Sequence, residues 1–102
     1  MTIWWSYVPT AIAESGWTDY VNVTELVPTS RHYYEFKLPV TENPSGCKNN
    51  NLFYQDYTSN GADAMFTTLL EALKSRLNVR VYVTGRCNLS GYSEISSVSI
   101  VR

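Results

Sequence analysis

The chain has 102 residues and a formal net charge of −1, with eight Lys and Arg against nine Asp and Glu. This length predicts one domain with one core. The balanced charge, without a basic run, argues against nucleic-acid binding through phosphates and against charge-driven adhesion to an anionic membrane. No segment approaches the roughly 20 apolar residues of a membrane span, so membrane insertion is not expected.

Residues 1–15 are rich in aromatic and aliphatic side chains and are interrupted by Pro9. An edge strand and an arm that packs on a neighbouring subunit would both fit this composition. Trp4 and Trp5 would point to opposite faces of a strand, so one of them would need a partner, a ligand or a neighbouring chain. The stretch lacks the basic start and long apolar core of a signal peptide. We therefore expect an N-terminal arm or edge strand at 1–15 and a single domain at 16–102.

Alternating apolar and polar residues, bounded by turn residues, predict five strands. They cover residues 17–27, 31–38, 52–57, 78–85 and 94–101. The first two should form a hairpin through the turn at Pro28 and Ser30. The alternation assigns these residues to the inner faces of the first, second and fourth of these runs: Trp17, Val21, Val23 and Val27; His32, Tyr34, Phe36 and Leu38; Val79, Val81 and Val83.

Residues 61–77 form the only convincing helical pattern. Their apolar residues recur at helical spacing and mark one stripe: Ala62, Met65, Phe66, Leu69, Leu70, Leu73 and Leu77. Ser59 or Asn60 is expected to cap the start of this helix, and Asn78 to end it in a left-handed conformation. The polar side, with Asp63, Thr67, Glu71 and Lys74, is free to meet solvent or neighbouring chains.

The order of these elements is strand, strand, strand, helix, strand, strand. This mainly β order with one helix is that of the OB-fold, a five-stranded, partly open Greek-key barrel whose helix closes one end. The wide apolar stripe of the helix and the Val-rich strand after it agree with that packing. A ferredoxin-like fold would need a second helix between the first two strands, where the turn is too short.

Both cysteines, Cys47 and Cys87, lie in polar, turn-like surroundings. Free structural cysteines prefer apolar surroundings, so this placement suggests a disulfide and an oxidising compartment. Two unrelated thiols are the alternative. A metal site is not expected, because one His and no CxxC pair accompany these cysteines. We expect a secreted or periplasmic protein whose signal peptide has been removed.

Residues 65–101 combine the helix, the Val-rich strand, Cys87, a glycine–aromatic turn and a last strand. This run resembles small exported bacterial OB-fold proteins, including the receptor-binding B subunits of AB5 toxins of the subtilase-cytotoxin and pertussis-like branches. The positions of Cys47 and Cys87 agree with that family. The resemblance implies a homo-pentamer with helices around a pore, host glycans bound on the side wall, and a catalytic A subunit as partner. The Trp4–Trp5 segment has no counterpart in this resemblance.

Catalysis finds little support in the sequence. His32 is the only His and has no nucleophile beside it, and there is no GxSxG elbow, carboxylate pair, phosphate loop or dinucleotide motif. We therefore expect a non-enzymatic protein without cofactors. Family sialic-acid sites use a Ser or Thr hydroxyl and a Tyr, but this chain has many of each.

Glycan binding is the function that the composition favours, because sugar sites combine aromatic faces with short polar side chains. The aromatic candidates are Trp4, Trp5, Tyr20, Tyr33, Tyr54, Tyr57, Tyr82 and Tyr92, and the polar ones are Thr18, Asn22, Ser30 and Asn50. We place the site on the outer surface near Tyr33 and Tyr82, with Ser30. Two alternatives stay open: an exported oligomeric module that binds no sugar, and an OB-fold reader of single-stranded nucleic acid, which would lack its basic groove.

Overall fold

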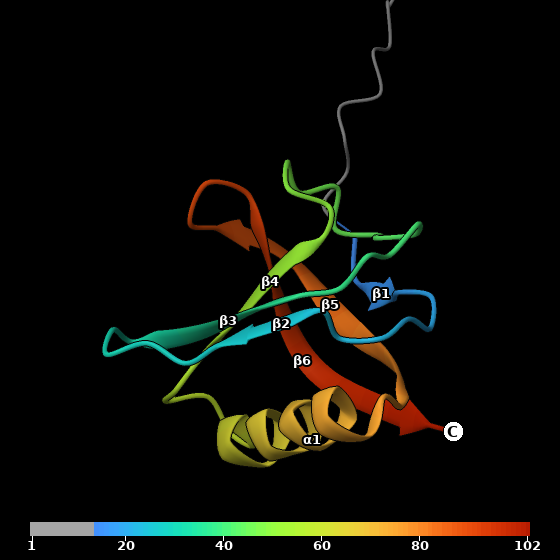
Figure 1. Ribbon diagram of the computed structural model, residues 1–102. Coiled ribbons are helices and arrows are strands. Elements are labelled where there is room, and N and C mark those ends of the chain that lie inside the picture. The colour runs from blue at the N-terminus through green and yellow to red at the C-terminus, as the bar shows by residue number, and fades with distance from the viewer. Residues whose placement is uncertain (1–13) are drawn as a thin grey trace, which may run out of the picture.

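The computed structural model describes residues 14–102, which form one sheet and one helix (Figure 1). The elements are β1 (Gly16–Trp17), β2 (Glu25–Val27), β3 (Tyr33–Lys37), β4 (Leu52–Asp56), α1 (Ala62–Ser75), β5 (Asn78–Asn88) and β6 (Tyr92–Val101). The predicted mainly β architecture with one helix is confirmed for these residues. The expectations for the Trp4–Trp5 segment lie outside the described residues.

The six strands form one mixed sheet with the order β1-β5-β6-β4-β3-β2. Only β4 and β6 are parallel, and they pair at Phe53↔Ser93 and Tyr54↔Glu94. The other neighbours are antiparallel. The sheet is not closed, because its end strands β1 and β2 do not pair with each other. It curves strongly, and α1 lies across one of its ends (Figure 1).

The single strand predicted at 17–27 is wrong. The structure has the short strands β1 and β2, with only an isolated bridge from Val21 to Val79 between them. Thr18 explains the break: its side-chain oxygen accepts a hydrogen bond from the Val81 amide at 3.1 Å, and it is buried. The alternation shifts at this point, so Trp17 is 36 % exposed instead of joining Val23 in the core.

The core lies between the concave side of the sheet and α1. The predicted inner faces of the second and fourth runs are confirmed, except for His32, which is exposed before β3. The aromatic rings of Phe36 and Phe53 stack at 5.3 Å between neighbouring strands. The fully buried hydrophobic side chains are Tyr34, Phe36, Leu38, Phe53, Leu69, Ala72, Val79, Val81, Val83 and Ile95.

Helix α1 is shorter at both ends than predicted, and its caps differ. Its N-cap is Gly61 in a left-handed conformation (φ 78°), so neither Ser59 nor Asn60 caps it. Arg76, at φ 55°, ends the helix instead of Asn78, which pairs with Val101 as the first residue of β5. Among the described residues, no helix has the length and apolar character needed to cross a membrane.

The last two strands are longer than predicted, because the expected loop at 87–93 is mostly paired. Cys87 lies opposite Ser93, and Asn88 lies opposite Tyr92. The loop is therefore reduced to a tight turn at Leu89, Ser90 and Gly91. The predicted disulfide between Cys47 and Cys87 is confirmed, and it joins this hairpin to the segment before β4.

Candidate functional site

A hollow of about 360 Å³ opens on the outer side of the sheet, between β3 and the turn that joins β5 to β6. We call this hollow the pocket. Its lining comes from three parts of the chain: Arg31, Tyr33 and Glu35; Asn49 and Leu52; and Leu89, Ser90 and Tyr92. Its volume is at the lower end of the range for small-molecule sites, so it could accommodate one sugar unit.

Strand alternation explains the β3 side of the pocket. Tyr34 and Phe36 are buried on the inner face, so Tyr33 and Glu35 share the outer face. Arg31 precedes the strand, and one of its terminal nitrogens donates a hydrogen bond to the Tyr33 hydroxyl at 3.0 Å. The Tyr33 ring also contacts the Tyr54 ring edge to face, at 6.3 Å between centroids. The Tyr33 ring is thus fixed from two directions.

The ionisable groups of the lining have a defined charge or protonation state at neutral pH. The hydrogen bond to Tyr33 is the main cause that raises the pKa of Arg31, so its guanidinium stays positive. Burial, followed by the negative charge of Glu35, raises the pKa of Tyr92. A Tyr hydroxyl is protonated at neutral pH even without this shift, so that of Tyr92 can donate a hydrogen bond. With one Arg and one Glu, the lining has no net formal charge.

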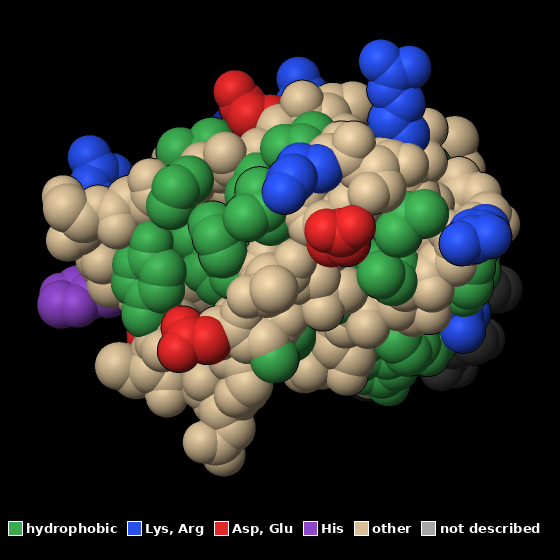
Figure 2. All heavy atoms as spheres, turned by 60° about the horizontal axis from the view of Figure 1, so that its bottom comes forward, with side chains coloured by type: hydrophobic (Ala, Val, Ile, Leu, Met, Phe, Trp, Pro, Cys, Tyr) green, Lys and Arg blue, Asp and Glu red, His purple; other side chains and the backbone are tan. Residues whose placement is uncertain are grey.

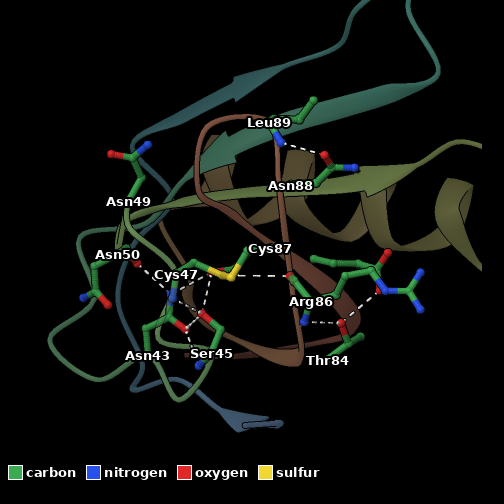
Figure 3. The surroundings of a disulfide bond; sticks show 12 residues. Asn43, Ser45, Cys47, Asn49, Asn50, Thr84, Arg86, Cys87, Asn88 and Leu89 are labelled. Carbon is green, nitrogen blue, oxygen red and sulfur yellow. Dashed lines mark hydrogen bonds between the residues drawn. A yellow bond between two sulfur atoms is a disulfide. The ribbon is translucent and has the colours of Figure 1, made fainter. Parts of the chain in front are cut away.

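The disulfide brings together the opposite wall of the pocket. Figure 3 shows Asn49 and Leu89 on the two segments that Cys47 and Cys87 join. The Asn49 amide also donates to the Gly91 carbonyl at 3.0 Å. Gly91 has φ 96°, and a Cβ there would lie 2.6 Å from Lys48 Cβ. Only glycine allows this close approach, so the turn is fixed against the segment before β4.

Of the three predicted site residues, only Tyr33 lines the pocket. Ser30 is exposed in the loop between β2 and β3. Tyr82 lies on β5, which β6 and β4 separate from β3. The structure therefore does not bring Tyr82 together with Tyr33.

Tyr82 belongs to another aromatic group, which we call the aromatic stack: Trp17, Tyr20, Arg80 and Tyr82. The guanidinium carbon of Arg80 lies 4.3 Å from the Trp17 ring centroid and 4.9 Å from that of Tyr20. The Trp17 and Tyr82 rings meet edge to face at 5.4 Å. These contacts link residues of β1 and the following loop to β5, so the stack stabilises that junction.

The helix side of the molecule presents a third surface. Figure 2 shows hydrophobic side chains gathered on this face, with positive and negative side chains interspersed and no patch of one sign. Leu70, which the apolar stripe predicts to be buried, is 39 % exposed on α1. This side also has a hollow of about 330 Å³ between the end of α1 and the end of β6, lined by Glu71, Ser75, Leu77, Ile100, Val101 and Arg102, but no aromatic ring lines it.

Residues 14–102 contain no group of three or more His, Cys, Asp and Glu side chains placed to bind a metal ion. The charged and polar lining of the pocket is arranged for hydrogen bonding.

Sequence reasoning missed most of the pocket lining: Arg31, Glu35, Asn49, Leu52, Leu89 and Ser90. Two signals could have identified part of it. The alternation that exposes Tyr33 also exposes Glu35 beside it. The predicted disulfide places the residues after Cys47 near those after Cys87, and therefore Asn49 near Leu89.

Comparisons of the chain with protein-family models, with curated proteins and with solved structures find no match.

Proposed function

We propose that this protein is a non-enzymatic glycan-binding protein and that the pocket is its sugar site. The observation that carries the proposal is the composition of one hollow: Tyr33 and Tyr92 supply aromatic surface, and Arg31, Glu35 and Asn49 supply hydrogen-bonding groups. A pyranose presents both an apolar face and a ring of hydroxyls, and it needs both kinds of partner.

We further propose that the sheet is of the OB type. Strands β1 and β2 are consecutive in the chain and lie at opposite ends of the strand order, so together they take the place of one bent first strand. On that basis β3 and β4 correspond to the second and third strands of the fold. The turn between β5 and β6 corresponds to the loop between its fourth and fifth strands.

This correspondence supports the choice of site. OB-folds bind oligosaccharides and oligonucleotides on the face of strands two and three, between the loops that follow the first and fourth strands. The pocket lies between β3 and the β5–β6 turn, with Arg31 from the preceding loop. An oligonucleotide is the weaker choice, since Glu35 balances the charge of Arg31 and a phosphate backbone requires positive charge.

The proposal extends to the whole protein, which would be an exported protein similar to a toxin B subunit. It would assemble as a homo-oligomer, a pentamer by resemblance, and could associate with a catalytic A subunit. The disulfide agrees with an oxidising compartment. A single pocket this open would bind a sugar weakly, with a dissociation constant on the order of 1 mM. Several pockets on one assembly would raise the apparent affinity through multivalency.

A glycan array probed with the assembled protein tests this proposal. We expect a defined subset of glycans to bind, and binding to decrease when Tyr92 is replaced by Ala. A Tyr20→Ala variant is a matched control, because Tyr20 is an exposed tyrosine of the aromatic stack and does not line the pocket. An array without binding, from a sample shown by light scattering to be oligomeric, would contradict glycan binding.

The second candidate is an exported interaction module that binds no sugar. The apolar helix face with Leu70 favours it, because exposed apolar area often marks a protein–protein contact. A blank array together with a concentration-dependent mass that Leu70→Glu abolishes would support this candidate.

A further inference from the structure

The turn at the rim of the pocket has a sequence that does not suit its backbone. Leu89 and Ser90 have φ values of 52° and 66°, and the Gly91 amide donates to the Asn88 carbonyl at 3.1 Å. Positive φ at both central residues is the geometry of a type I′ hairpin turn, which strongly prefers Asn-Gly. A bulky residue such as Leu is a true outlier in this region.

The surroundings maintain this strained turn. The disulfide joins Cys87 to Cys47 two residues before it. The Asn49 side chain donates to the Ser90 carbonyl at 2.5 Å, and its backbone amide bonds to Gly91. Strained residues that the rest of the structure enforces cluster at ligand sites. Because both Leu89 and Ser90 line the pocket, their side chains give a reason for the strain.

The lining has three chemical features close together. Arg31 offers guanidinium donors beyond the one used by Tyr33, and Glu35 offers a carboxylate acceptor. Leu89 and Leu52 add apolar surface to this otherwise polar site. An acetamido group has matching parts: a carbonyl that accepts, an N–H that donates and a methyl group. The carboxylate of Glu35 balances the charge of Arg31, so the lining has no net charge to attract an acidic sugar.

We propose that the pocket selects a neutral sugar that carries an acetamido group, and that Leu89 in its strained turn contacts the methyl group. This inference rests on the proposed glycan-binding function and narrows it. Leu89 is then a specificity-determining residue, whereas Asn at this position would relax the turn.

The test compares two probes, methyl N-acetyl-β-D-glucosaminide and methyl β-D-glucoside, by NMR titration of the full chain. We expect the native protein to bind the acetamido sugar about tenfold more tightly, as one methyl-sized apolar contact with its hydrogen bonds allows. The L89N/S90G variant restores the preferred turn sequence. It should raise the melting temperature by about 3 °C and reduce the tenfold preference to less than twofold.

A Leu70→Asn variant is the control, because it removes an exposed leucine outside the pocket and should leave the preference unchanged. Equal binding of both probes by the native protein would overturn the inference but leave glycan binding intact. Retained preference in L89N/S90G would exclude Leu89 as its source. Absence of binding to either probe and to every glycan of the array would overturn the function itself.

Discussion

The pocket and the aromatic stack both gather aromatic rings on the outer surface of the sheet, but the rings are engaged differently. In the stack, Arg80 lies over Trp17 and Tyr20, while Trp17 meets Tyr82. In the pocket, Tyr33 and Tyr92 border a hollow together with charged and amide groups. Aromatic content alone therefore does not identify a binding site here. What distinguishes the pocket is ring surface beside polar groups that face open space.

The two regions also differ in how the chain builds them. The stack joins β1 to its neighbour β5, and its members come from residues 17–20 and 80–82. The pocket combines three separate segments, and two of them are joined by the disulfide and by hydrogen bonds from Asn49 to Ser90 and Gly91. Changes to the disulfide should therefore affect the pocket more than the stack.

The largest effect is expected from the C47A/C87A variant. The disulfide spans 40 residues, and in the chain-entropy model its loss lowers the free energy of unfolding by about 4 kcal/mol. Urea denaturation followed by circular dichroism measures this change. Where the variant remains folded, it should lose glycan binding while the amide signals of Trp17 and Tyr82 stay in place. A loss below about 1 kcal/mol would contradict the structural role of the disulfide.

The second prediction concerns the stack. Trp17→Ala removes the ring that contacts both Arg80 and Tyr82, and should lower the free energy of unfolding by about 2 kcal/mol, less than for a fully buried Trp. Glycan affinity should stay within about twofold, since the stack is separate from the pocket. Thermal denaturation and sugar titration of the same sample measure both quantities. A tenfold loss of affinity with unchanged stability would assign the site to the stack.

The third prediction concerns the pocket, where a substitution should weaken binding instead of leaving it unchanged. Tyr33→Ala should weaken glycan binding about tenfold, equivalent to about 1.4 kcal/mol, because it removes an aromatic face and the hydrogen-bond partner of Arg31. Tyr82→Ala, the matched change in the stack, should leave affinity unaltered. Isothermal titration of both variants decides between them. Equal losses would restore the site that the sequence predicts, with Tyr33 and Tyr82 together.

The smallest effect is expected at Asp19, beside the stack. Burial raises the pKa of this carboxyl, but the hydrogen bonds it accepts from Glu42 and Thr41 outweigh burial and lower the pKa below its usual value. A lowered pKa stabilises the fold above the unfolded pKa, and this contribution is lost as pH falls through the folded value.

Asp19→Asn should therefore cost less than about 1 kcal/mol at pH 7, since the group is largely solvated. The native protein and the variant should converge in stability near pH 2. Urea midpoints at the two pH values measure this. If the difference in stability between the two proteins increased as the pH fell, the direction assigned to the pKa shift of Asp19 would be wrong.

Residue periodicity was sufficient to predict the long elements. The inner faces of β3 and β5 and most of the stripe of α1 follow from periods of two and 3.6. Periodicity failed at Thr18, whose side-chain oxygen accepts the hydrogen bond from the Val81 amide that a backbone carbonyl accepts in a regular strand. The alternation of apolar and polar residues does not reveal this kind of pairing. The caps of α1 were missed for two reasons. Gly61 is the N-cap in place of Ser59 or Asn60, and Arg76 adopts the left-handed conformation that was expected of Asn78.

The site was less accessible to sequence reasoning. Tyr33 was identified from its outward position, but its neighbours in space come from distant segments. Leu89 and Ser90 were expected only as part of a loop at 87–93, because Leu-Ser does not indicate a turn with positive φ at both central residues. Their proximity to Asn49 follows from the disulfide, which the polar context of the two cysteines did predict. The residues that follow the two cysteines form one wall of the pocket, so the predicted disulfide could have identified that wall.

The most direct test of the account is a titration of the ¹⁵N-labelled protein with methyl N-acetyl-β-D-glucosaminide, followed by two-dimensional NMR. If the pocket binds this sugar, the amide signals of Tyr33, Leu89, Ser90 and Tyr92 should shift together and saturate with one dissociation constant on the order of 1 mM. Those of Trp17 and Tyr82 should not move. Saturable shifts confined to the stack, or no saturable shift anywhere, would contradict the claim that the pocket binds sugar.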